Sequence, residues 1–428
     1  MKYASALIAV SCLFSVAAGQ WMETTIQLPA GSGGPKALCY NSESDKVYSA
    51  NYLDPGNVTV IDGATNQVVM TVPALAYPIS LCHNPVNNKV YCANNGTNAL
   101  SVIDGATNSV STIRLIGANW PQAVCCNPQD NKVYSANYLS ANFSIIDGTA
   151  DTVIAHVPVG AGPTALCHTP GDNKVYCASY GNDSVTVIDG ATNQVVATLW
   201  SGLTPHVLCH NSQDDKVYSA NRYGSDVAVI DGAADTVVAR VPVGREPFAL
   251  CYNPRDNKVY CANYEDSSVT VIHGATNSVL ASVRVGDSPR ALCYNPVNNK
   301  VLCANLGADN VTVIDGTSNA VLRTIGVGNG PAAFCFSPTH NRAYVANYPD
   351  RSISVLRDSS QVGTGETSNE KPRAAPTATL VRGLPTAAVA FDAMGRRVAG
   401  AKPGVYFVAD EAHGSGRTVR FRKVVIQR

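Results

Sequence analysis

A unit of about 42 residues recurs eight times along the chain, and this repetition constrains the fold more than any other feature. Each unit contains a cysteine that follows a proline by four residues. These anchor cysteines are Cys39, Cys82, Cys125, Cys167, Cys209, Cys251, Cys293 and Cys335, and successive ones lie 42 or 43 residues apart. After the anchor, most units read Lys-Val-Tyr, then Ala-Asn, a short polar loop, and a segment close to Val-Thr-Val-Ile-Asp-Gly. The chain is therefore built largely from copies of one structural unit.

Four short apolar runs in each unit alternate as β-strands do. In the fourth unit they cover residues 164–168, 174–178, 185–188 and 195–199. β-Branched residues dominate the last two runs, which favours a pleated sheet over a helix. Asp-Gly between the third and fourth runs is typical of a tight hairpin. Four strands in each repeat of this length predict the blade of a β-propeller.

The number of strands predicts how the ring closes. Eight units each supply a first, second and third strand, but only seven third strands are followed by a fourth, and the eighth unit stops at residues 353–356. The missing strand is found at the other end, where residues 24–28 precede the first anchor cysteine. A strand that joins the two ends of the chain removes exposed sheet edges. We therefore predict an all-β fold in which residues 20–357 form an eight-bladed β-propeller of four-stranded blades, with an N-terminal strand closing the last blade.

The two ends of the chain have different compositions from the repeats. Residues 1–19 carry Lys2, a short apolar core and small residues at the end, which is typical of a secretory signal peptide. The apolar run is too short to span a bilayer, so we expect an exported protein without a transmembrane segment. Residues 358–379 lose the repeat pattern and are rich in Gly, Ser and Pro, which predicts a flexible linker. Strand-like segments resume in residues 380–428 and predict a small C-terminal β domain.

Two resemblances follow from these motifs. The segment Tyr344-Val345-Ala346-Asn347, together with the recurring Val-Thr-Val-Ile-Asp-Gly-Ala-Thr-Asn, resembles the YVTN β-propeller repeat family of exported and surface-layer proteins. That resemblance implies the fold, but its adhesive, scaffolding and cofactor-linked members leave the function open. The tail, with Asp-x-x-Gly-Arg at 392–396 and Gly-x-Tyr at 404–406, resembles the C-terminal sorting domain of the type IX secretion system. This implies the type IX secretion machinery as a partner and the outer cell surface or the extracellular space as the location.

Charge argues against a nucleic-acid partner. Lys and Arg number 31, as do Asp and Glu, so the net charge is zero and no global attraction to a polyanion exists. From residue 380 onward the chain holds nine basic and three acidic residues, a surplus of six. Nucleic-acid or membrane binding is one interpretation of that surplus. The basic residues lie within strand-like segments rather than in a block, and we therefore favour the sorting domain.

The cysteines allow two interpretations. Four units carry a second cysteine ten residues after the anchor, which gives the candidate disulfides Cys82–Cys92, Cys167–Cys177, Cys251–Cys261 and Cys293–Cys303. An exported protein would meet an oxidising compartment in which such bonds persist. Alternatively, cysteine serves as a small buried hydrophobe, which the four anchors without a second cysteine favour. The spacing of nine intervening residues does not suit a zinc site, and we expect no metal.

Positions that vary between repeats are the candidate binding residues. No nucleophile elbow, zinc-protease, phosphate-loop or haem-attachment motif is present, so we predict no catalytic residue and no cofactor. The two most variable sets are the residue after the first-strand proline and the loop between the second and third strands, which is often tyrosine-rich. In a propeller both sets lie on one face, around the central channel. From them we take as candidate ligand-binding residues Lys36, Gln122, His206, Arg222, Phe248 and Arg290.

We favour a binding function over a catalytic one. The preferred hypothesis is an exported, monomeric scaffold at the cell surface or in the medium that binds a protein or glycan through its loop face. The alternative is a propeller enzyme, such as a lactonase, lyase or cofactor-dependent oxidoreductase, with His206 and Arg290 at the channel mouth. Convergence of the candidates on one cavity that contains a carboxylate or metal would favour the enzyme, whereas a shallow Asn- and Tyr-lined face would favour binding.

Overall fold

The computed structural model describes residues 20–358 and, farther along the chain, five strands between residues 379 and 426. The predicted signal peptide and residues 359–378 of the predicted linker lie outside the described residues. The chain divides into two compact units, Met1–Gly363 and Thr364–Arg428. Between them no relative placement is defined, and each unit is described by itself.

Eight four-stranded antiparallel sheets follow one another along the first unit. Blade 1 consists of β2 (Gly34–Asn41), β3 (Lys46–Tyr52), β4 (Asn57–Asp62) and β5 (Val68–Pro73). Blade 2 consists of β6 (Pro78–Asn84), β7 (Lys89–Asn94), β8 (Ala99–Asp104) and β9 (Val110–Arg114). Blade 3 consists of β10 (Pro121–Asn127), β11 (Lys132–Asn137), β12 (Asn142–Asp147) and β13 (Thr152–Pro158). Blade 4 consists of β14 (Pro163–Thr169), β15 (Lys174–Ser179), the 3-10 turn η1 (Tyr180–Asn182), β16 (Ser184–Asp189) and β17 (Val195–Trp200).

The second half of the ring repeats this arrangement. Blade 5 consists of β18 (Pro205–Asn211), β19 (Lys216–Asn221), β20 (Asp226–Asp231) and β21 (Thr236–Pro242). Blade 6 consists of β22 (Pro247–Asn253), β23 (Lys258–Asn263), β24 (Ser268–His273) and β25 (Val279–Arg284). Blade 7 consists of β26 (Pro289–Asn295), β27 (Lys300–Asn305), β28 (Asn310–Asp315) and β29 (Val321–Gly326). Blade 8 consists of β30 (Pro331–Ser337), β31 (Arg342–Asn347), β32 (Ser352–Asp358) and the N-terminal strand β1 (Gln20–Gln27).

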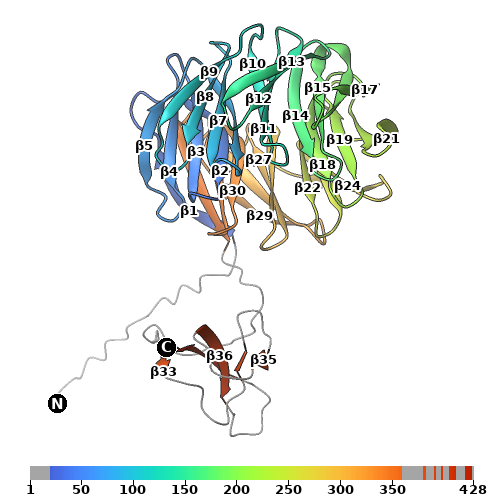
Figure 1. Cartoon of the computed structure of the whole chain (residues 1–428). Helices are drawn as coiled ribbons and strands as arrows, with labels where there is room; N and C mark the ends of the chain where they lie inside the picture. The colour runs from blue at the N-terminus through green and yellow to red at the C-terminus, as the bar shows by residue number, and fades with distance from the viewer. Residues whose placement is uncertain are drawn as a thin grey trace, which may run out of the picture. The chain divides into compact units, whose positions relative to one another are not determined.

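The ring closes through β1, as the strand count predicts. β1 pairs antiparallel with β32, from Gln20 opposite Asp358 to Gln27 opposite Ser352. Figure 1 shows the blue strands from the start of the chain beside the orange strands from the end of the ring. The first strands of neighbouring blades contact one another all the way round, so they form the inner wall. The predicted eight-bladed, four-stranded propeller is confirmed.

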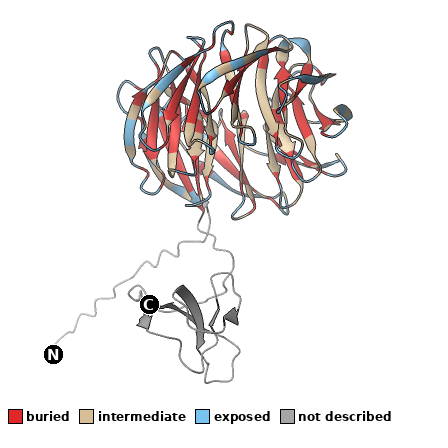
Figure 2. Ribbon diagram, viewed as in Figure 1, coloured by how far each residue is buried: buried red, intermediate tan, exposed pale blue. Residues whose placement is uncertain are grey.

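The hydrophobic core lies between the blades rather than inside any one of them. Eight buried clusters are present in the ring, one at each interface between neighbouring blades. In one cluster Tyr260 and Val269 of blade 6 pack against Val301 and Ile314 of blade 7. The second and third strands are buried, while the fourth strands are largely exposed (Figure 2). A single blade therefore cannot bury its own apolar faces, which explains why the units must stack.

The recurring Lys-Val-Tyr segment links each blade to the next. Lys258 donates hydrogen bonds from Nζ to the carbonyls of Gly316 and Thr317 in blade 7, at 2.7 and 2.8 Å. Tyr260, two residues later, donates from its hydroxyl to the Gly316 carbonyl at 3.1 Å. Lysine and tyrosine at alternate positions of a strand lie on the same face of the sheet, so one face of the blade carries both donors.

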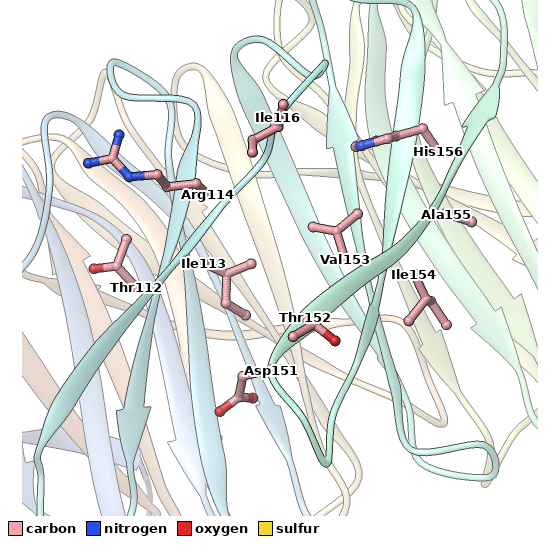
Figure 3. A pocket seen from close by; sticks show the side chains of 10 residues that line it. All are labelled: Thr112, Ile113, Arg114, Ile116, Asp151, Thr152, Val153, Ile154, Ala155 and His156. Carbon is pink, nitrogen blue, oxygen red and sulfur yellow. The ribbon is translucent and has the colours of Figure 1, made fainter.

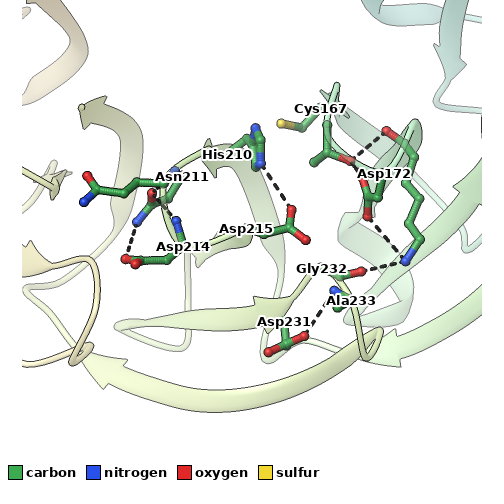
Figure 4. A network of polar contacts seen from close by, with 12 residues as sticks. Cys167, Asp172, His210, Asn211, Asp214, Asp215, Asp231, Gly232 and Ala233 are labelled. Carbon is green, nitrogen blue, oxygen red and sulfur yellow. Dashed lines mark hydrogen bonds and ion pairs between the residues drawn. The ribbon is translucent and has the colours of Figure 1, made fainter.

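A second set of polar links connects neighbouring blades at this end of the ring. At six interfaces the asparagine that ends a first strand donates to an asparagine of the next blade: Asn41–Asn88, Asn84–Asn131, Asn127–Asn173, Asn211–Asn257, Asn253–Asn299 and Asn295–Asn341. Thr169 and Ser337 replace the donor at the other two, and there the next blade carries Asp215 or Asp45. Figure 4 shows Asp215 facing His210, with Nε2 and Oδ1 3.6 Å apart.

The candidate hairpin disulfides, one of the two interpretations of the cysteines, do not fit the register of the strands. In the structure, no sulfur–sulfur bond joins any two of the thirteen cysteines within residues 20–358. In the register of blade 2, Cys82 lies opposite Tyr91, and Cys92 lies opposite Leu81. Directly paired residues share a face of the sheet, and neighbours along a strand alternate, so the two thiols point to opposite faces. The same register holds for Cys167 and Cys177, Cys251 and Cys261, and Cys293 and Cys303.

The C-terminal unit contains a separate sheet. Its strands are β33 (Thr379–Val381), β34 (Ala390–Phe391), β35 (Arg397–Val398), β36 (Gly404–Asp410) and β37 (Arg420–Ile426). Their order is β33-β37-β36-β34-β35, and β33 runs parallel to β37. In the part of the chain that the structure describes, no helix has the length and apolarity needed to cross a bilayer.

Candidate binding site at the channel mouth

A β-bulge places one residue of every blade outside the regular ladder. In each first strand the pairing passes from the proline to the second residue after it, and the residue between them has no partner in the register. The eight bulge residues are Lys36, Ile79, Gln122, Thr164, His206, Phe248, Arg290 and Ala332. Bulges re-aim side chains and are common beside binding sites. One of the two most variable sets of positions in the repeats thus lies at a β-bulge.

Three of the bulge residues line a cavity of about 310 Å³. Gln122, Thr164 and His206 come from consecutive blades, and loop residues complete the wall. The full lining is Trp120, Gln122, Tyr138, Thr164, Tyr180, His206 and Arg222. This volume lies at the lower end of the range for small-molecule sites, and aromatic walls with a few polar groups are typical of them.

Phe248 connects the cavity to the next blades. Its ring centroid lies 4.5 Å from that of His206 and 5.7 Å from that of Tyr264. The guanidinium carbons of Arg290 and Arg222 lie 4.6 and 5.3 Å from the same ring. Both distances are in the range of cation–π contacts. Four of the six predicted residues therefore form one contiguous group around a phenyl ring.

Lys36 extends this group to the first and last blades. Its Nζ lies 3.7 Å from the ring centroid of Tyr348 and 5.6 Å from that of Tyr52. Burial, and after it the charge of Arg290, lowers the pKa of Lys36. All six predicted residues are thus gathered at one mouth of the channel, with Gln122 joined to the others through the shared cavity.

The mouth carries more positive than negative charge. Arg222 pairs with Glu246, with Nη2 and Oε2 2.9 Å apart. Neither Lys36 nor Arg290 has a carboxylate partner within residues 20–358. Burial, and to a smaller extent Arg222, lowers the pKa of Arg290 against an opposing effect of Tyr264. The two unpaired cations are held in a setting that disfavours their charge.

His206 is neutral at physiological pH. Burial, followed by the charges of Arg222 and Arg290, lowers its pKa to about 4, although Glu246 acts in the opposite direction. A neutral imidazole offers one donor and one acceptor. It is therefore suited to hydrogen-bonding a hydroxyl group.

The low pKa of His206 predicts a pH-dependent stability. The unfolded chain takes up the proton near the ordinary value of 6.5, whereas the folded chain does so only near 4, so stability falls as the pH falls through this interval. His206→Gln removes the group that takes up the proton. Glutamine already occupies the equivalent bulge in blade 3, as Gln122, so the fold should accept it. Between pH 7 and pH 4, urea unfolding should show the variant losing about 3 kcal/mol less stability than the wild type. Parallel losses in the two proteins would contradict the low pKa.

Two residues of the site were missed from the sequence. Glu246 and Trp120 each precede the first-strand proline, and each has a left-handed backbone, with φ of 51° and 60°. This position also differs from blade to blade, and that variation was the signal that could have found them. Its left-handed conformation is unusual for residues other than glycine and turns the side chain toward the mouth.

A larger cavity, of about 480 Å³, lies on the outer rim of the ring. Figure 3 shows it between β9 and β13, the exposed fourth strands of blades 2 and 3. Its lining comprises Thr112, Ile113, Arg114, Ile116, Asp151, Thr152, Val153, Ile154, Ala155 and His156. None of the predicted binding residues lies there. Within residues 20–358, no three His, Cys, Asp or Glu side chains are grouped to share a metal ion.

The fold and the mouth define an eight-bladed β-propeller with a cationic, aromatic site on its axis. Residues 196–398, slightly less than half of the chain, match the family model described as Lactonase, 7-bladed beta-propeller. The ring has eight blades where that description has seven.

Two solved structures share the fold. Hydrazine synthase of Kuenenia stuttgartiensis is 17% identical, with a TM-score of 0.56, over 77% of this chain and 97% of that one. Sqt1 of Saccharomyces cerevisiae is 10% identical, with a TM-score of 0.67, over 78% of this chain and 98% of that one. At such identities the likeness concerns the fold alone. No curated protein matches the sequence.

Proposed function

We propose that this chain is an exported scaffold, at the cell surface or in the medium, that binds a protein or glycan through its channel mouth. The observation that carries the proposal is the convergence of six variable side chains on one mouth, five of them aimed there by bulges. Side chains that differ among otherwise repeated blades do not maintain the fold, so they are free to specify a ligand. The predicted signal peptide and the sorting-domain resemblance support delivery outside the cell.

Retention of a ligand by the purified propeller tests the binding role. Glycan arrays and pull-downs with the mature chain should give a specific ligand, and Phe248→Ala should abolish its retention while leaving the circular dichroism spectrum unchanged. Ile154→Ala, on the exposed outer strand β13, is the matched control and should retain the ligand. Equal loss in both variants, or specific turnover of a substrate without any retained partner, would overturn the proposal.

The type IX machinery is the proposed export partner. Deleting residues 380–428 should leave the propeller in the periplasm, because the segment that resembles the sorting domain is then missing. Cell fractionation with surface proteolysis measures this. Unchanged delivery to the surface would contradict the assignment.

A propeller enzyme is the second candidate, because a carboxylate and a neutral imidazole share the mouth. Glu246 and His206 interact electrostatically, and both lie within the residues that match the lactonase-family model. Hydrolysis of a lactone panel tests this candidate. Turnover that His206→Gln abolishes would favour the enzyme over the scaffold.

A further inference from the structure

We propose that the ligand of the channel mouth is an acidic glycan, whose carboxylate is bound by Arg290 and Lys36 while its sugar rings lie against the aromatic wall. This inference rests on the proposed binding function and names the ligand class. It draws on two separate properties of the mouth, its uncompensated charge and its aromatic lining.

The positive charge of the mouth favours binding of an anion. Of its three cations, only Arg222 has a carboxylate partner, Glu246. Arg290 and Lys36 are partly buried and rest on aromatic rings instead of acids. Burying a charge without a partner is costly, and a bound carboxylate relieves that cost for both groups. A guanidinium is also the side chain best matched to a planar carboxylate, which it binds through two parallel hydrogen bonds.

The lining of the mouth favours a sugar over a peptide. The cavity is compact, about 310 Å³, and is walled by Trp120, Tyr138 and Tyr180. Flat aromatic faces pack against the apolar faces of sugar rings. Gln122, Thr164 and His206 supply neutral donors and acceptors that suit hydroxyl groups. Peptide recognition, in contrast, typically uses an extended groove or a free strand edge.

Acidic glycans and their uncharged methyl esters form matched probes that test the contribution of the carboxylate charge to binding. Oligogalacturonates and sialylated glycans should bind the mature protein, whereas their methyl esters, of the same shape without the charge, should bind at least about tenfold more weakly. The double variant Arg290→Ala, Lys36→Ala should lose that tenfold preference for the acids. Arg245→Ala is the control, because this exposed arginine is already paired with Asp266. Calorimetry of the full mature chain gives the affinities.

The outcomes separate the two proposals. Binding of neutral glycans or esters as tightly as acids, with loss on Phe248→Ala, overturns the acidic-glycan inference and keeps the binding function. Preference for polyglutamate over every acidic glycan also overturns it. A mouth whose substitutions affect no ligand at all overturns both.

A different observation carries a second inference. The Sγ atoms of Cys82 and Cys126 lie 2.8 Å apart, on the inner strands β6 and β10 of neighbouring blades. Cys126 departs from the repeat, since the residue after the anchor is aromatic in the other blades: Tyr40, His83, His168, His210, Tyr252, Tyr294 and Phe336. We infer that Cys82 and Cys126 form a disulfide that joins blades 2 and 3.

The Cys82–Cys126 bond forms by thiol–disulfide exchange with a small disulfide such as oxidised glutathione. The reagent's sulfur–sulfur bond breaks, the Sγ–Sγ bond forms, and the two thiol protons leave with two molecules of reduced thiol. A disulfide requires sulfur atoms about 2.0 Å apart, so this pair needs only a small approach. The four cysteine pairs within hairpins cannot form disulfides in this way, because their thiols lie on opposite faces of a sheet.

Thiol counting after refolding tests the disulfide. The mature protein, unfolded and refolded in a glutathione redox buffer, should keep eleven free thiols of its thirteen, and peptide mapping should recover the Cys82–Cys126 link. Cys126→Ser should show twelve free thiols. Thirteen free thiols in the refolded wild type, or a link between other cysteines, would overturn the inference.

Discussion

Arg342→Ala is expected to lower the free energy of unfolding by about 3 kcal/mol, because this side chain closes the ring. Its Nε and Nη2 donate to the carboxylate of Glu23 on β1, both at 2.7 Å. Its Nη1 donates to the carbonyls of Gly63 and Ala64 in blade 1, at 2.7 and 2.8 Å. The Arg342 side chain is only 8% exposed. One residue thus links the last blade, the N-terminal strand and the first blade, and urea unfolding at pH 7 measures its contribution.

The variant Arg342→Lys and the pH dependence of the Arg342→Ala effect both test this role of Arg342. Lysine occupies this position in the other seven blades and reaches the equivalent carbonyl, as Lys46 does at 2.6 Å, so the variant should lose only about 1 kcal/mol. The hydrogen bonds from Arg342 lower the pKa of Glu23 below its ordinary 4.5, so the stabilisation is complete above that pH and is lost as the pH falls through the folded-state value. The difference between wild type and Arg342→Ala should therefore shrink in acid. A difference that does not change with pH would contradict the proposed role of the ion pair.

Tyr260→Ala is expected to lower the free energy of unfolding by about 4 kcal/mol, more than Arg342→Ala. Tyr260 is fully buried in the cluster between blades 6 and 7, so truncation leaves a cavity at an interface that two blades share. Tyr260→Phe removes only the hydroxyl. It should cost about 1 kcal/mol, because Lys258 still donates to the Gly316 carbonyl.

The chain itself supplies the matched control for Tyr260. Blade 7 carries Leu302 at the equivalent position, where it is also fully buried. Tyr260→Leu should therefore cost about 2 kcal/mol, between the phenylalanine and alanine variants. Guanidinium unfolding of the three variants gives the order. A leucine variant as unstable as the alanine variant would show that packing volume does not dominate at this interface.

Much of the candidate site could be predicted from the repeats. Lys36, Gln122, His206, Phe248 and Arg290 were found because they vary at a position where the neighbouring residues do not. The bulge that frees them from the ladder was not predicted, because pairing register depends on the partner strand. Glu246 was missed because its role comes from the ion pair with Arg222, which joins residues 24 apart in the chain.

The choice between the two interpretations of the cysteines also depended on register. The nine residues between Cys82 and Cys92 suit a hairpin, but only the register decides which face of the sheet each thiol meets. The contact of Cys82 with Cys126, 44 residues away, depends on how two blades stack. No local pattern encodes that distance.

The sequence by itself determined the blade, the number of blades and the strand that closes the ring, because strand alternation, turn residues and period are local properties repeated eight times. Only the tertiary structure decided which variable side chains meet, which of their charges stay unpaired and which thiols touch. Those properties arise where different blades converge on one axis, and the distances there depend on packing across the whole ring rather than on neighbours in the chain.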